Sequence, residues 1–142
     1  MKKKTGLLVL VLFIISASFA QDKDETAVRN LLAEQTKEWN NGNIPAFMET
    51  YWKSDSLMFV GKSGVTYGWQ KTMDNYKKNY PDAAAMGKLN FDLLQVKKLS
   101  RTYFFVVGKW HLTRSIGDIG GSFTLVIHKI NNSWVIVADH SS

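Results

Sequence analysis

Hydrophobic residues in the first half of the chain recur at the spacing of a helix face. The longest such stretch begins near the capping pair Asp22 and Glu25 and stops at Asn40-Asn41-Gly42. A short helix follows from Asn43, and a third helix ends at Pro81. The positions that define the three stripes are Val28, Leu31, Leu32, Gln35 and Trp39, then Phe47, Met48 and Tyr51, then Trp69, Met73, Tyr76 and Tyr80.

The second half of the chain has the pattern of strands. Residues 89–96, 102–113, 123–129 and 134–140 are rich in aromatic and β-branched side chains, and turn-forming residues separate them. A shorter hairpin, formed by residues 56–60 and 65–67, precedes the third helix. This order of elements predicts an α+β domain with an antiparallel sheet.

Two of the strands are apolar on both faces. An antiparallel sheet with one wet face should alternate apolar and polar residues, but residues 103–107 and 134–138 do not. Three helices cover only one face of such a sheet. We therefore predict that the other face meets a second copy of the chain in a symmetric homodimer. The alternative is a strongly curled sheet that buries both faces within one chain.

The amino end predicts a cleavable export signal. Lys2, Lys3 and Lys4 precede an unbroken apolar run over residues 7–15, and small residues at 18 and 20 allow cleavage after Ala20. The apolar run is shorter than the roughly 20 residues of a membrane-spanning helix, so a stable membrane anchor is not expected. We therefore predict one domain over residues 21–142 in the periplasm or outside the cell.

Charge and cysteine content narrow the function classes. The net charge of +6 includes three lysines of the predicted signal, and the remaining basic pairs are isolated, so no nucleic-acid partner is expected. The absence of cysteine excludes disulfides, a thiol nucleophile and a lipid-modified cysteine. His111, His128 and His140 have no tight ligand spacing, so we expect neither a metal site nor a cofactor.

Several short motifs, in this order, resemble the nuclear transport factor 2-like superfamily and, within it, the SnoaL-like branch of small bacterial proteins of unknown function. They are Trp39-Asn40-Asn41-Gly42-Asn43, Gly68-Trp69, Tyr80-Pro81, Gly87-Lys88-Leu89-Asn90-Phe91, Gly108-Lys109-Trp110 and Asp139-His140-Ser141-Ser142. The resemblance implies a cone-shaped domain in which three N-terminal helices pack on a curled antiparallel sheet. It also implies an apolar pocket inside the cone and, in most members, a homodimer.

The steroid-isomerase members of this superfamily offer a comparison residue by residue. Their first-helix tyrosine falls at Gln35, their aspartate base at Phe59, and their protonated aspartate at Thr124. Proton transfer through an oxyanion hole needs a base and strong donors at these places. Because all three groups are replaced, steroid isomerisation is not expected of this chain.

The last hairpin predicts which polar groups enter the pocket. A two-residue turn at Asn131-Asn132 would set Thr124 opposite Asp139. The alignment with the steroid isomerases places Thr124 on the pocket face, so Asp139 and Ser141 are expected there with it, while His140 faces the other way.

The preceding hairpin predicts a further part of the pocket. A turn centred near Asp118 would bring Thr113 beside Thr124 and put His111 on the same face. A register slip of one residue would remove His111 from the pocket.

Three functions remain open at this point. The first is binding of a small apolar or amphipathic molecule by Gln35, Trp39, Phe59, Trp69, Tyr76, Thr113, Thr124 and Ser141. The second is a dehydratase, cyclase or hydrolase with His111 and Asp139 as catalytic residues, although the same groups could form a structural hydrogen-bond network. The third is a protein–protein adaptor that uses the open face of the sheet.

Overall fold

The computed structural model describes residues 22–142, so the predicted signal peptide lies outside the described residues. Four helices are present: α1 (Lys23–Asn40), α2 (Ile44–Met48), α3 (Trp69–Asn79) and α4 (Ala83–Met86). The first three agree with the helical stripes of the sequence, and α4 is an additional single turn after Pro81. Within residues 22–142, no helix has the length and apolar character needed to cross a membrane.

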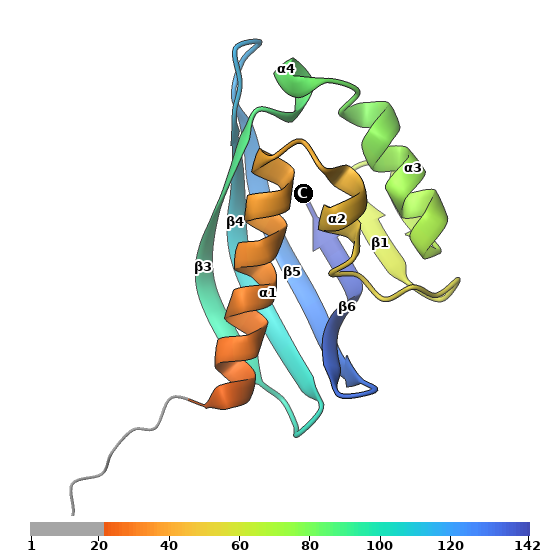
Figure 1. Ribbon diagram of the computed structural model, residues 1–142, viewed down its shortest axis with the longest axis vertical. Helices are drawn as coiled ribbons and strands as arrows, with labels where there is room; N and C mark the ends of the chain where they lie inside the picture. The colour runs from red at the N-terminus through yellow and green to blue at the C-terminus, as the bar shows by residue number, and fades with distance from the viewer. Residues whose placement is uncertain (1–21) are drawn as a thin grey trace, which may run out of the picture.

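Six strands form one curled sheet, and the helices cover its concave side (Figure 1). The strands are β1 (Met58–Gly61), β2 (Gly64–Tyr67), β3 (Lys88–Lys98), β4 (Tyr103–Thr113), β5 (Ile119–Ile130) and β6 (Ser133–Ser141). Their spatial order is β2-β1-β6-β5-β4-β3.

The sheet is mixed, which corrects the prediction of a wholly antiparallel one. The β1 strand runs parallel to β6, with Phe59 opposite Asp139, whereas the other neighbouring strands are antiparallel. A hairpin turn forces neighbouring strands to be antiparallel, but β1 and β6 are joined through most of the chain and are free of that constraint.

Asparagine side chains explain why the Asn40-Asn41-Gly42-Asn43 motif ends one helix and begins the next. The Asn43 side chain caps α2 by accepting a hydrogen bond from the Ala46 amide at 3.1 Å. Asn40 binds the backbone of Leu89, accepting from its amide at 2.7 Å and donating to its carbonyl at 3.1 Å. The motif therefore fixes the end of α1 to the start of β3.

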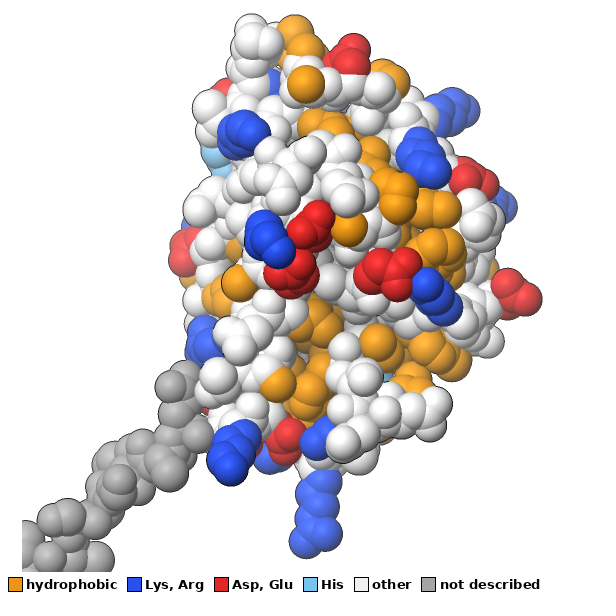
Figure 2. Space-filling model, in the orientation of Figure 1, with side chains coloured by type: hydrophobic (Ala, Val, Ile, Leu, Met, Phe, Trp, Pro, Cys, Tyr) orange, Lys and Arg blue, Asp and Glu red, His pale blue; other side chains and the backbone are white. Residues whose placement is uncertain are grey.

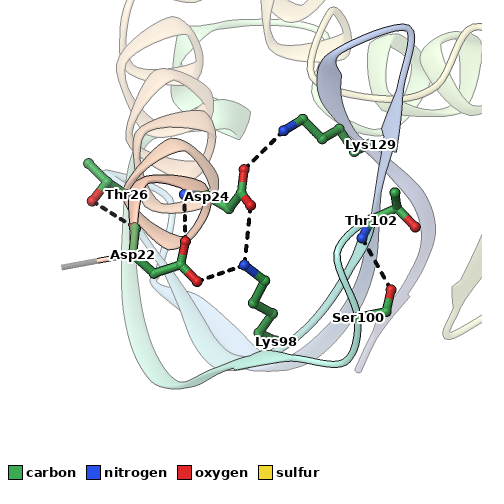
Figure 3. Close-up of polar contacts among 7 residues, drawn as sticks. All are labelled: Asp22, Asp24, Thr26, Lys98, Ser100, Thr102 and Lys129. Atoms are coloured by element: carbon green, nitrogen blue, oxygen red, sulfur yellow. Dashed lines mark hydrogen bonds and ion pairs between the residues drawn. The ribbon is translucent and has the colours of Figure 1, made fainter. Parts of the chain in front are cut away.

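A group of four charged residues fixes the opposite end of α1 (Figure 3). We call Asp22, Asp24, Lys98 and Lys129 the helix-end clamp. Lys98 contacts Asp22 at 2.7 Å and Asp24 at 3.2 Å, and Lys129 contacts Asp24 at 3.0 Å. Hydrogen bonds from these lysines lower the pKa of both aspartates. The carboxylates also lie at the positive end of the helix dipole, so the clamp joins α1 to β3 and β5 with favourable electrostatics.

The core lies between α1, α2 and the concave side of the sheet. Its fully buried side chains include Val28, Leu32, Met48, Leu57, Phe104, Val106, Leu112, Ile127 and Ile136. Figure 2 shows the helix-covered side, where further hydrophobic side chains gather over the region of α2 and α3.

The opposite side of the sheet, here called the outer face, is apolar across five strands. One row, which the strand pairing places side by side, is Tyr67, Met58, Ala138, Val126 and Phe105. Tyr67 is 61% exposed, and the other four are half-buried. No element of residues 22–142 packs on this face, and the sheet is not closed.

Candidate functional site

A cavity of about 100 Å³ lies between the helices and the concave side of the sheet. Its aromatic lining consists of Trp39, Phe47, Tyr51, Phe59, Tyr76, Tyr80, Phe91, Trp110 and Phe123. The remaining lining residues are Gln35, Leu89, Leu112, Leu125, Asp139 and Ser141. A cavity of about 150 Å³ is enough to hold a benzene molecule, so this one suits a compact ligand of a few heavy atoms.

The helical stripes of the sequence place the aromatic rings around Trp39. Phe47, Tyr76 and Tyr80 meet Trp39 edge to face, with ring centroids 5.2, 5.9 and 4.9 Å away. The Trp39 indole donates a hydrogen bond to the Met86 carbonyl at 3.0 Å, so its polar atom is satisfied outside the cavity. Such edge-to-face pairs are favourable geometries for aromatic rings and hold the wall of the cavity in place.

The polar end of the cavity is centred on the Asp139 carboxyl. Tyr51 donates its hydroxyl proton to Oδ2 of Asp139 at 2.7 Å, and Ser141 donates to Oδ1 at 2.8 Å. The hydroxyl of Tyr76 lies 3.4 Å from that of Tyr51. A carboxyl and two tyrosine hydroxyls therefore form a connected group inside an otherwise apolar space.

Burial changes the acid–base properties of this group. Asp139 is only 5% exposed, and this burial raises the pKa of its carboxyl from 3.8 to about 6, although the hydrogen bonds from Tyr51 and Ser141 act in the opposite direction. Burial also raises the pKa of Tyr51 and of Tyr76 well above the ordinary value, with the nearby Asp139 charge adding to the effect. Both tyrosines thus remain neutral donors, while Asp139 exchanges its proton near neutral pH.

Several residues predicted to bind a ligand do line this cavity. They are Gln35, Trp39, Phe59, Tyr76 and Ser141, and the candidate catalytic residue Asp139 lies among them. Gln35 is 2% exposed and donates to the Thr50 hydroxyl at 2.8 Å, so part of its hydrogen-bonding capacity fixes α1 to the end of α2.

Thr124 lies on the outer face, which corrects its predicted place in the pocket. The turn at Asn131-Asn132 has the predicted register near its start, with Ile130 opposite Ser133. Val137 then forms a bulge, so that Asp139 pairs with Leu125, and Thr124 pairs with His140. The bulge moves Thr124 away from the cavity while it leaves Asp139 and Ser141 inside.

His111 also lies on the outer face, so the predicted pairing of His111 with Asp139 is wrong. Its neighbours Trp110 and Leu112 line the cavity, and alternate residues of a strand point to opposite faces. The imidazole is exposed and lies 3.1 Å from the carboxylate of Asp118. This geometry removes the version of the enzyme hypothesis that uses His111.

Thr113 and Trp69 lie outside the cavity as well. Thr113 is exposed at the end of β4 opposite Lys88. The Trp69 indole donates to the Met48 carbonyl at 2.8 Å, and the Lys53 amine lies 5.2 Å from the centre of its ring. Trp69 therefore joins α3 to α2 and does not face the ligand space.

The sequence-based site did not include Tyr51, which holds the Asp139 carboxyl. Its spacing of four residues from Phe47 marks it as an apolar position of the short helix. That spacing places Tyr51 on the core side but does not reveal its hydrogen bond to a strand 88 residues further along the chain.

As for metals, the part of the chain that the structure describes has no group of three or more metal-ligating side chains.

Comparisons with known proteins are informative for the fold. A scan against protein-family models and a search of curated proteins both gave no match. Among solved structures, an NTF-2 like protein of unknown function from Shewanella oneidensis MR-1 is 39% identical, with a TM-score of 0.81 over 84% of this chain and 98% of that chain. A ketosteroid isomerase-like protein from Erwinia carotovora atroseptica is 15% identical, with a TM-score of 0.67 over 85% of this chain and 96% of that chain. An NTF2-like superfamily protein from Salmonella enterica is 17% identical, with a TM-score of 0.65 over 83% of this chain and 89% of that chain.

Proposed function

Because this chain belongs to the nuclear transport factor 2-like superfamily, we propose that it is an exported, homodimeric protein that binds a small apolar or amphipathic molecule. The aromatic cavity with a single polar end is the observation that carries the proposal. Ligand sites are typically concave and mostly apolar, with a few polar groups that fix the orientation of the ligand. Asp139, Tyr51 and Tyr76 are such groups here, and the rings around Trp39 form the apolar part.

Binding can be tested by filling the cavity from within. Leu125 lies in its wall and is 3% exposed, so Leu125→Trp places additional volume where a ligand would sit. Small cyclic compounds should raise the unfolding temperature of the original protein and leave this variant unchanged. Val28→Ile, a buried change on the same face of α1 but nearer its amino end, outside the cavity lining, is the matched control and should retain the response. If the compounds raise the unfolding temperature of Leu125→Trp as much as that of the original protein, binding in this cavity is contradicted.

The homodimer is proposed from the outer face. Beside its apolar row, a second row contains Val65, Val60 and Val107, with the polar His140 and Thr124 between Val60 and Val107. The apolar patch is therefore widest over β1 and β2. Large contiguous apolar patches on soluble proteins mark interaction sites. A second copy of the same face has the same shape and the same apolar character, as an isologous dimer requires.

Light scattering after gel filtration tests the dimer. The protein without residues 1–20 should have twice the mass of one chain, and Val126→Lys, within the apolar row, should have the mass of one. Leu99→Lys adds the same charge in the β3–β4 turn, where Leu99 is 55% exposed, and should remain dimeric. A monomer in the unsubstituted protein would instead favour the adaptor hypothesis, with a different chain on this face.

Export is proposed from the signal pattern alone. Expression of the full chain in a Gram-negative host should yield a protein that begins at Gln21 and fractionates with the periplasm or the medium. An intact-mass measurement reads the cleavage site directly, and retention of residues 1–20 would contradict this part of the proposal.

A second function, acid–base catalysis by Asp139, is favoured by the buried carboxyl and the adjacent tyrosine hydroxyls. A general base works best when its pKa is close to the working pH, and that of Asp139 is raised to about 6. Tyr76 could donate to an oxygen on which negative charge develops. Small cyclic ketones incubated with the protein in D₂O should then lose their C–H signals next to the carbonyl, while the Asp139→Asn variant leaves them intact. Equal exchange in both proteins would exclude this chemistry.

A further inference from the structure

The cavity contains one ionisable group that carries charge near neutral pH, and that group is negative. None of the lining residues is lysine, arginine or histidine. Burial raises the pKa of the lining tyrosines Tyr51, Tyr76 and Tyr80, so these hydroxyls stay neutral near neutral pH. When Asp139 is ionised, the ligand space therefore carries a net negative charge.

This charge has no positive partner among the described residues. The ion pairs of residues 22–142 all lie elsewhere, and none includes Asp139. A buried carboxylate without a cation is unfavourable, and proteins normally pair such a group. Two hydrogen bonds reach Asp139, whereas a carboxylate can accept about four, so it retains capacity for a donor from a ligand.

The rest of the lining also favours a positive ligand. The face of an aromatic ring attracts a cation, most strongly where water is excluded. The rings of Phe47, Tyr76 and Tyr80 are inclined to Trp39 by 66°, 75° and 77°, so the wall presents rings in several orientations. An aromatic wall with one carboxylate is the combination that stabilises an ammonium group on all sides.

We propose that the cavity selects a small organic cation, such as an alkylammonium or quaternary ammonium group, whose charge is met by Asp139 and the surrounding aromatic rings. This inference rests on the proposed function that the cavity holds a small molecule. The volume of about 100 Å³ restricts the cation to a compact group. An anionic ligand is disfavoured, because it would be buried beside a carboxylate with no cation to offset the repulsion.

A pair of probes with the same shape and different charge tests the selection. Choline and 3,3-dimethylbutan-1-ol differ only in whether a positive nitrogen or a neutral carbon occupies the centre of the branched group. Calorimetric titration at pH 7.5 should show choline binding about tenfold or more tightly than the neutral alcohol. In Asp139→Asn this preference should fall to the smaller contribution of the aromatic rings, while the affinity for the alcohol changes by less than about threefold.

A pH titration provides a second test that needs no substitution. The titratable groups that face Asp139 are Tyr51 and Tyr76, both from the helical side. Its neighbours on β1 and β5 are Phe59 and Leu125, which do not titrate. The remaining titratable neighbour, His140, lies on the outer face. Since the pKa of Asp139 is about 6, the affinity for choline should fall about ten- to thirtyfold from pH 7.5 to pH 4.5. The affinity for the neutral alcohol should stay constant.

The outcomes separate this inference from the function on which it rests. Binding of the alcohol as tightly as choline would overturn the selection of cations but support a small-molecule site. A choline affinity that is independent of pH and of Asp139→Asn would overturn the role of the carboxyl. Absence of binding by both probes would overturn the cation inference, while the comparison of the original protein with Leu125→Trp decides the binding function separately.

Discussion

Replacing Asp139 by asparagine should change how the stability of the fold depends on pH. The carboxyl is buried at the polar end of the cavity, and its pKa in the folded protein is raised above that in the unfolded chain. The folded protein therefore holds this proton more tightly than the unfolded chain does. The stabilisation is complete only below the unfolded pKa of 3.8, and it is lost as the pH rises through about 6. Asparagine does not titrate, so the variant lacks this contribution.

The size of the effect follows from the shift. The pKa of Asp139 rises from 3.8 to about 6, and each pKa unit corresponds to about 1.4 kcal/mol, which gives a change of about 3 kcal/mol. Because the side chain is 5% exposed, solvent screening removes little of this value. Asp22, Asp24 and Asp118 have lowered pKa values and act in the opposite direction, but they are the same in both proteins.

Urea unfolding, followed by tryptophan fluorescence at a fixed protein concentration, measures the difference. Between pH 7.5 and pH 4, the unfolding free energy of the original protein should gain about 2.4 kcal/mol relative to that of Asp139→Asn, because at pH 4 the unfolded carboxyl is still partly ionised. Parallel curves, within about 0.5 kcal/mol at every pH, would refute the reasoning that burial keeps this carboxyl protonated.

Three further substitutions test other contacts. Tyr51→Phe removes a hydrogen bond to a charged group, so it should lower the free energy of unfolding by about 1.5–3 kcal/mol at pH 7.5. The loss should be smaller at pH 4, where the Asp139 carboxyl is neutral. Equal losses at the two pH values in urea unfolding would contradict this. Gly87→Ala should lower the unfolding temperature more than Gly42→Ala does. Both glycines have positive φ, but only a Cβ at Gly87 would collide with the backbone. Equal decreases in unfolding temperature, measured by calorimetry, would contradict the clash. Lys98→Met breaks both of its ion pairs in the helix-end clamp, yet it should lower the unfolding temperature only slightly. In 1 M salt, which screens surface charges, the difference should vanish. A large decrease in unfolding temperature that persists in salt would indicate a packing role.

The sequence was informative wherever neighbouring residues determine the structure. The stripe that ends at Trp39, the turn at Gly42 and the start of α2 follow from helix spacing and capping, and the structure confirms them. The same spacing placed Trp39 and Tyr76 on the core side, and both line the cavity. The family resemblance is confirmed by the similarity to NTF2-like structures.

Contacts between distant segments were not predictable in this way. The bulge at Val137 lies in a run of apolar residues, where no alternation exists to show that the register shifts. Gly120 and Gly121 looked like part of a turn, but both lie in β5. A side chain at Gly121 would collide with the backbone of Ser142, so this glycine permits a close approach and does not mark a turn. The observed pairing puts Val107 opposite Thr124 in place of Thr113, an even shift that keeps the face of the strand. His111 was therefore put on the wrong face because it shares a face with Thr124, which the bulge at Val137 moves out of the cavity.

The bulge at Val137 has a consequence for redesign of the cavity. Asp139 and His140 are adjacent and point to opposite faces of β6. If Val137 paired with Val126 instead of bulging, every later residue of the strand would change face, and the imidazole of His140 would replace the carboxyl of Asp139 inside the cavity. An acid would be exchanged for a base without any substitution among the residues that touch the ligand. A change of backbone pairing on β6 is therefore a route to a cavity of opposite charge preference.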